Sequence, residues 1–124
     1  MFGNTISMAH KALDFLWVKQ EVTSANIANV DTPNYKKKNV TFEEEFGRRL
    51  RAASGTGSNK AVRQAIDEAD YQIYSRDDSA RVDENNVNMD VEQTTLARTT
   101  LHYQYLLQSV TYDVQRFRAA IKGQ

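Results

Sequence analysis

Two stretches with a seven-residue apolar repeat, one near each end of the 124-residue chain, constrain its fold more than any other feature. In the N-terminal stretch the repeat consists of Ile6, Leu13, Gln20 and Ile27, together with Ala9, Leu16, Thr23 and Val30 three residues after each. Positions seven apart lie on one face of a helix, so these residues predict a helix to about residue 30. Phe15, Trp17 and Val22 lie outside this stripe, which indicates that the helix also contacts a second neighbour.

The C-terminal stretch has the same periodicity over a longer span. Its two series are Met89, Leu96, Tyr103, Val110 and Phe117, and Gln93, Thr100, Leu107, Val114 and Ile121. Two such series are typical of a coiled-coil seam. Asp90 with Gln93 predicts the N-cap of this helix, and Gly123 is suited to end it after Lys122. At about 1.5 Å per residue the helices are about 37 and about 50 Å long, so the second is expected to project and to need another partner.

The first helix is predicted to end in the segment from Asn29 to Tyr35. Pro33 has no backbone N–H to donate and disfavours the helical conformation at Thr32. Asp31 and Asn34 are common turn formers. The chain is therefore expected to leave the helix sharply at this point.

The middle of the chain is polar and less regular. Thr41 and Glu44 form a capping-box pattern that predicts a short helix. Residues 54–60, SGTGSNK, are typical of a flexible linker. Residues 61–88 leave two alternatives open: a helix through Val62 and Ile66, or short extended pieces that include Tyr71, Ile73 and Val82.

These patterns predict a mainly α fold. Two long terminal helices pack antiparallel in a coiled-coil-like fashion, and a polar, partly irregular middle segment either holds a short helix and a small β-element or stays loop-like. We divide the chain into residues 1–35, 36–88 and 89–124, of which the first and last together form one structural domain.

Composition excludes several classes of function. Sixteen Lys and Arg balance sixteen Asp and Glu, so the chain lacks the positive charge that general nucleic-acid binding requires. The absence of cysteine excludes disulfides and thiol chemistry. No catalytic motif or metal-ligand spacing occurs, so we expect no catalytic residue, cofactor, metal or small-molecule substrate. The first twenty residues lack the pattern of a cleavable signal peptide, and no apolar run approaches the roughly 20 residues that span a bilayer.

Residues 25–35, ANIANVDTPNY, resemble the rod motif of flagellar axial proteins of the rod and hook class. Small Ala25 and Ala28 suit close approach of another helix, and the polar residues with proline suit a sharp exit. The resemblance assigns to this motif Ala25, Asn26, Ile27, Ala28, Asn29, Asp31, Thr32, Pro33 and Tyr35.

A second stretch, DENNVNMDVEQTTLARTTLHYQYLLQSV from Asp83, is similar to the C-terminal signature of rod proteins of the FlgB type. That family commonly has Asp-Gly ahead of the Asn residues, whereas this sequence has Asp83 and Glu84, which leaves the local turn geometry open.

The resemblance implies a non-enzymatic structural subunit of the proximal rod in the bacterial flagellar basal body. It implies synthesis in the cytoplasm, type III export without a cleaved signal, and assembly in the periplasm, where the subunit polymerises through its terminal helices and transmits torque for motility. Its implied partners are other rod subunits, further copies of itself, the rod-to-ring adaptor protein, and the inner-membrane ring with the type III export gate.

We assign the assembly interface to apolar residues of both terminal helices: Ile6, Leu13, Leu16, Trp17, Ile27, Leu96, Tyr103, Leu107, Val110, Val114, Phe117 and Ile121. The alternative interpretation is a soluble coiled-coil adaptor or export chaperone, which has the same helical ends and neutral charge. Such a protein forms a closed dimer, whereas a rod subunit associates without a closed stoichiometry.

Overall fold

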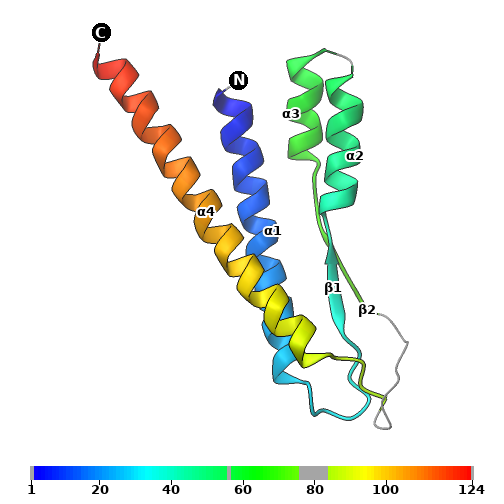
Figure 1. Cartoon of the computed structure of the whole chain (residues 1–124). Helices are drawn as coiled ribbons and strands as arrows, with labels where there is room; N and C mark the ends of the chain where they lie inside the picture. The colour runs from blue at the N-terminus through cyan, green and yellow to red at the C-terminus, as the bar shows by residue number, and fades with distance from the viewer. Residues whose placement is uncertain (1, 56, 76–83, 124) are drawn as a thin grey trace.

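The computed structural model describes residues 2–55, 57–75 and 84–123 of the chain. In chain order its elements are α1 (Phe2–Ala28), β1 (Lys38–Thr41), α2 (Glu43–Ser54), α3 (Asn59–Asp67), β2 (Gln72–Ser75) and α4 (Met89–Lys122). The two terminal helices run antiparallel, lie side by side where α1 ends and α4 begins, and diverge toward the opposite end (Figure 1). This arrangement confirms the predicted fold class.

The end of α1 lies two residues before the expected boundary at Val30. The backbone N–H of Val30 still bonds to the Ile27 carbonyl at 3.2 Å, so the helix closes with a tighter turn before the chain leaves it. Pro33 follows in the turn, and Asn34 has a φ of 63°, in the left-handed region that Asn tolerates better than most residues. The predicted sharp exit is confirmed.

The start of α4 differs from the prediction. The N-cap is Asn88, whose side-chain oxygen accepts hydrogen bonds from the backbone N–H groups of Asp90 (3.1 Å) and Val91 (3.3 Å). Asp90 therefore lies inside the first turn, where its carboxylate opposes the positive end of the helix dipole. The prediction of Asp90 as N-cap is wrong because Asn88, two residues earlier, is also a residue type that caps helices well. Gly123 is the C-cap, as predicted, and its N–H bonds to the Ala119 carbonyl at 2.8 Å.

The middle segment is a two-stranded ribbon that carries a helical hairpin. β1 pairs antiparallel with β2, with Lys38 opposite Ser75 and Thr41 opposite Gln72. Both alternatives for this region hold in part, because α3 includes Ile66 and β2 includes Ile73, while Val82 lies outside the described residues.

Two boundary predictions in the middle segment are wrong. Thr41 ends β1 and its hydroxyl donates to the Gln72 carbonyl at 3.4 Å, so it lies one residue too early to cap α2. The expected linker is only a short turn, because α2 extends to Ser54 and α3 begins at Asn59. Ser58 caps α3, its hydroxyl accepting from the Ala61 N–H at 3.3 Å.

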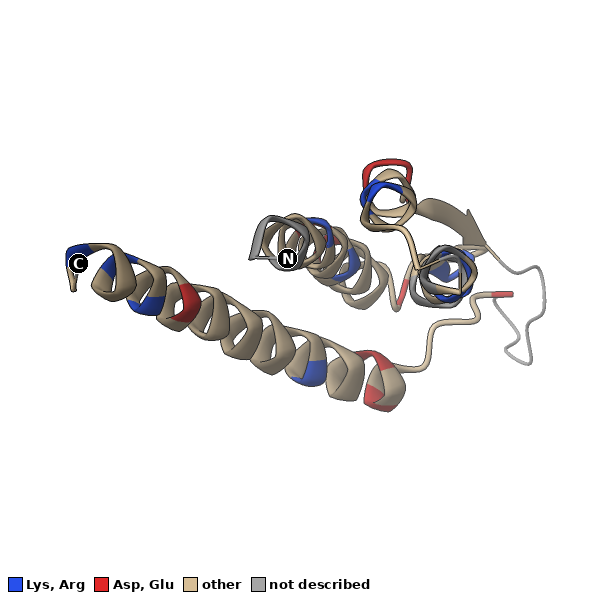
Figure 2. Ribbon diagram, turned by 90° about the horizontal axis from the view of Figure 1, so that it is seen from above, with Lys and Arg blue, Asp and Glu red and all other residues tan. Residues whose placement is uncertain are grey.

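The helix α1 lies between α4 and the α2–α3 hairpin (Figure 2). The core forms where the ribbon meets α1: Phe15 and Leu16 pack with Phe42 and Ala69, all almost fully buried. The ring of Phe42 stacks on Phe15 at 4.6 Å between centroids. Lys11 fixes the hairpin to α1, because its ammonium donates to the carbonyls of Asp67 (3.3 Å) and Ala69 at the end of α3.

None of the helices within the described ranges is long and apolar enough to span a bilayer.

Candidate functional site

The buried amide of Asn26, in the last turn of α1, joins three separate segments. Its Nδ2 group donates to the Lys38 carbonyl at 2.8 Å and to Glu92 Oε2 at 3.2 Å. Its Oδ1 atom accepts from the Lys38 backbone N–H and from the Tyr35 hydroxyl, both at 3.0 Å. An amide offers two donors and two lone pairs, so Asn26 is fully satisfied although only 1% of it is exposed. It ties the end of α1 to β1 and to α4.

Glu92 is a buried carboxylate in the first turn of α4, with 2% of its surface exposed. Lys37 lies with its Nζ atom 2.7 Å from Glu92 Oε1, while Oε2 accepts from Asn26. A buried charge without a counter-charge is strongly destabilising, so this arrangement holds only when the turn after α1 is in place. The ion pair therefore couples the turn to the start of α4.

Tyr35 completes this cluster from the turn. Burial raises the pKa of the Tyr35 phenol above its ordinary value of 10.0, and the negative charge of Glu92 raises that pKa further. The phenol accordingly stays protonated and donates its hydrogen to Asn26 at neutral pH.

Asn85 forms a second link between the two long helices. It is completely buried, and its Nδ2 group donates to the carbonyls of Asn29 and Thr32, each at 2.8 Å. Its Oδ1 atom accepts from the Val87 N–H at 2.8 Å. Glu84, just before it, has a φ of 59°, where glycine is favoured. This is the position at which the resembled signature carries glycine, and the positive φ supplies the physical reason.

The other residues of the motif occupy the surface of this junction. Ala25 and Ile27 are half-buried, whereas Ala28, Asp31 and Pro33 are exposed. The motif thus combines buried hydrogen-bonding side chains with an exposed turn. We call the buried polar cluster of Asn26, Tyr35, Lys37, Asn85 and Glu92 the polar clasp.

Sequence reasoning missed three members of the polar clasp: Lys37, Asn85 and Glu92. Lys37 is the middle one of three consecutive lysines, and nothing in the sequence distinguishes it from its neighbours. Glu92 resembles any acidic residue in a first helical turn. The signal for Asn85 was present in the paired Asn residues before α4. Within the three described ranges, no group of three or more His, Asp or Glu side chains is placed to hold a metal ion.

The residues assigned to the assembly interface divide into three groups. Leu16 lies in the subunit's own core. Half-buried positions along the two terminal helices are Ile6, Leu13, Ile27, Leu96, Tyr103, Val110 and Val114. Exposed apolar positions are Trp17, Leu107, Phe117 and Ile121. The fully buried positions described on α4 are Glu92 and Thr99, and neither belongs to the two predicted apolar series.

Two further exposed apolar features lie outside that assignment. Leu101, Tyr105 and Tyr112 are 66%, 74% and 52% exposed, and their spacing places them on the side of α4 opposite Tyr103. Beside Trp17, whose indole N–H donates to Glu21 at 2.8 Å, a groove of about 330 Å³ also borders Gln20 and Ser24. The two long helices thus present apolar surface on several sides.

Comparison with known proteins covers both long helices. A family model described as flagella basal body rod protein matches residues 9–36, which include most of α1 and the turn after it. The chain is 33% identical to the flagellar basal body rod protein FlgB of Bacillus subtilis, over 99% of this chain and 97% of that protein. It is 30% identical to FlgB of Escherichia coli, over 85% and 83%, and 30% identical to FlgB of Cereibacter sphaeroides, over 99% and 98%.

Replacing Lys37 tests the polar clasp. Lys37→Met leaves the Glu92 carboxylate buried without a counter-charge, and we expect the free energy of unfolding to fall by about 3–5 kcal/mol. Urea denaturation followed by circular dichroism measures it. The matched control is Lys38→Met on the neighbouring exposed side chain, which we expect to change stability by less than about 0.5 kcal/mol. Equal effects of the two changes would contradict the account.

Tyrosine titration tests the position of Tyr35. Of the six tyrosines, this one should ionise later than an unperturbed phenol when the absorbance at alkaline pH is followed. Because its pKa is raised in the folded state, its contribution to stability is complete below pH 10.0 and is lost as the pH rises through the raised pKa. Tyr35→Phe should remove the late step, and Glu92→Gln should move it toward lower pH. A titration that is the same in all three proteins would refute this position.

Proposed function

This chain belongs to the FlgB family of flagellar basal-body rod proteins, and we propose that it builds the proximal part of the rod by polymerising through α1 and α4. As a member of that family it is a component of the flagellar basal body. The family is one of structural proteins, and we propose that this subunit likewise has no catalytic role.

The observation that carries the proposed mode of assembly is the apolar face of α4 beyond its contact with α1. Val110, Phe117 and Ile121 follow Tyr103 at spacings that keep them on the face that packs on α1 nearer the polar clasp. Phe117 and Ile121 are nevertheless 47% and 59% exposed, because the two helices diverge at that end (Figure 1). An apolar stripe that remains about half exposed in the single subunit is the expected property of a subunit that meets another subunit there.

The opposite side of α4 supports contacts with more than one neighbour. Leu101, Tyr105 and Tyr112 expose large apolar surface on a helix whose other side already packs on α1. Exposed aromatic residues are enriched at the centres of protein interfaces. Subunits that pack laterally around an axis need two such faces, one for each neighbour, and this helix offers both.

The polar clasp gives the subunit a fixed geometry for this assembly. We propose that the two terminal helices, residues 1–35 and 89–124, form one structural domain, and that the middle segment, residues 36–88, is an accessory unit on α1. One ion pair and several hydrogen bonds at one end determine the angle between the helices, so each subunit offers its apolar faces in the same directions.

The remaining assignments follow from family membership and are proposals. The subunit would leave the cytoplasm through the type III export apparatus without a cleaved signal and assemble in the periplasm. Its neighbours there would be other rod subunits, the rod-to-ring adaptor protein, and the inner-membrane ring with the export gate. Through these lateral contacts it would anchor the rod and transmit torque.

Charge substitutions on α4 test the proposal. Phe117→Asp with Ile121→Asp places two carboxylates on the apolar stripe at positions that are exposed in the single subunit, so folding should be preserved. We expect the double variant to disappear from purified basal bodies and its cells to lose motility. The matched control is Arg118→Asp, an exposed position on the flank of the same turn between the two apolar faces of α4, which should assemble normally.

Two outcomes would contradict the proposed function. One is normal incorporation of the double variant into basal bodies. The other is sedimentation of the unchanged protein as a closed dimer that does not grow with concentration, which would favour an adaptor or export chaperone.

A further inference from the structure

The α2–α3 hairpin separates its charges along its length. Of its exposed basic side chains, Arg51 and Lys60 lie toward the tip, and Arg48 and Arg63 lie midway along α2 and α3. The Arg49 guanidinium reaches the base, where it donates to the Glu68 carbonyl at 3.1 Å. No acidic residue occurs between residues 46 and 66. The hairpin's base holds exposed Asp67, Glu68 and Asp70, and α2 itself begins with three consecutive glutamates in the sequence.

The charge order of α3 opposes the stability of that helix. A helix favours acidic residues at its N-terminus and basic residues at its C-terminus. α3 instead has Lys60 in its first turn and Asp67 and Glu68 at its end, with no acidic residue in the first turn and no basic residue in the last. α2, which runs in the opposite direction, has the favourable order, ending with Arg51. Although their charge orders differ, the two helices together give the hairpin an acidic base and a basic tip.

We propose that this pattern docks the hairpin of one copy against the hairpin of a second copy displaced along the long axis. The inference rests on the proposed function, in which copies of this chain polymerise. In a polymer built by one repeated screw operation, all copies point the same way. If two neighbouring copies lie level along the polymer axis, their hairpins place like charges opposite each other. If one copy is shifted along that axis by about the length of α3, about 14 Å, the tip of one hairpin lies against the base of the other.

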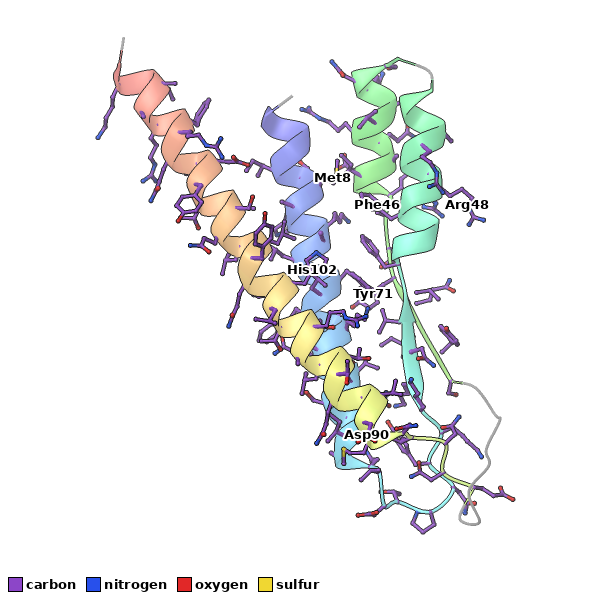
Figure 3. All side chains as sticks on the ribbon, in the orientation of Figure 1. Met8, Phe46, Arg48, Tyr71, Asp90 and His102 are labelled. Carbon is purple, nitrogen blue, oxygen red and sulfur yellow. The ribbon has the colours of Figure 1, made fainter. Side chains whose placement is uncertain are left out.

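The second copy is the occupant that the charges favour. The chain carries no net charge, so the acidic complement of a basic tip is present in every copy. Arg51 near the tip and Arg48 on the flank are arginines, and a guanidinium can pair with a carboxylate through two parallel hydrogen bonds. The tip also lacks an exposed aromatic or large aliphatic side chain among its described residues, so it offers no group to insert into a bilayer. Arg48 projects from α2 on the side away from α1, where a neighbour can reach it (Figure 3).

Paired charge reversals test the proposal. The tip variant carries Arg48→Glu, Arg51→Glu and Lys60→Glu, and the base variant carries Asp67→Lys and Glu68→Lys. We expect each alone to weaken self-association at low salt by at least about tenfold, measured by sedimentation across a concentration series. Combining all five changes restores opposite charges between tip and base, so association should return. High salt should reduce the differences between the variants.

The same substitutions contain a control for folding. Lys60→Glu and Asp67→Lys both improve the match between α3 and its dipole, so neither should lower the melting temperature through α3. A loss of association by a variant that remains fully helical is therefore an effect on the contact between copies.

Three results would overturn the proposal. The tip variant could associate as well as the unchanged protein, or the combined variant could remain as defective as the single ones. The tip variant could also lose binding to phosphatidylglycerol vesicles while its self-association is unchanged, which would assign the tip to a membrane surface. In each case Phe117→Asp with Ile121→Asp still reports on assembly through α4, so failure of this inference is distinct from failure of the proposed function.

Discussion

The rest of the structure depends on the burial of one carboxylate, Glu92, at the start of α4. Its charge is acceptable there because Lys37 and Asn26 reach it from the turn and from the end of α1. These partners lie far away in the sequence, so their contact, together with that of Asn85, holds the start of α4 against the end of α1. The antiparallel pairing of the two long helices follows from that contact.

The contact at this end of the helix pair also explains why α1 and α4 lie apart at the other end. Hydrogen bonds and an ion pair determine the angle at which α1 and α4 cross, and the helices then diverge (Figure 1). Phe117 and Ile121, on the face toward α1, remain exposed as a result, and Leu101, Tyr105 and Tyr112 are exposed on the opposite side of α4. The polar contacts are complete within the subunit, whereas the apolar faces are covered only by a neighbour. This combination suits a protein that folds as a single subunit and associates along the length of α4.

Periodicity in the sequence predicted the two long helices, because an apolar residue every seven positions is typical of a helix with one apolar face. It did not predict which face of α4 meets α1. The buried positions include Glu92 and Thr99, which no hydrophobic pattern selects, since their burial is offset by side chains from other segments. The exit motif was identified from its residues, but the role of Asn26 depends on four simultaneous hydrogen bonds that become visible only in three dimensions. The N-cap of α4 was misplaced for a simpler reason, because Asn88 and Asp90 are both residue types that cap helices well.

The central claim is that another subunit covers the exposed apolar face of α4 in the rod. Since the chain contains no cysteine, a single cysteine in place of Ile121 can be labelled selectively with a maleimide. The account predicts rapid labelling of the free subunit and strong protection in isolated basal bodies, whereas a cysteine in place of exposed Asp31 serves as the reference in both states. Equal labelling of position 121 before and after assembly would contradict it.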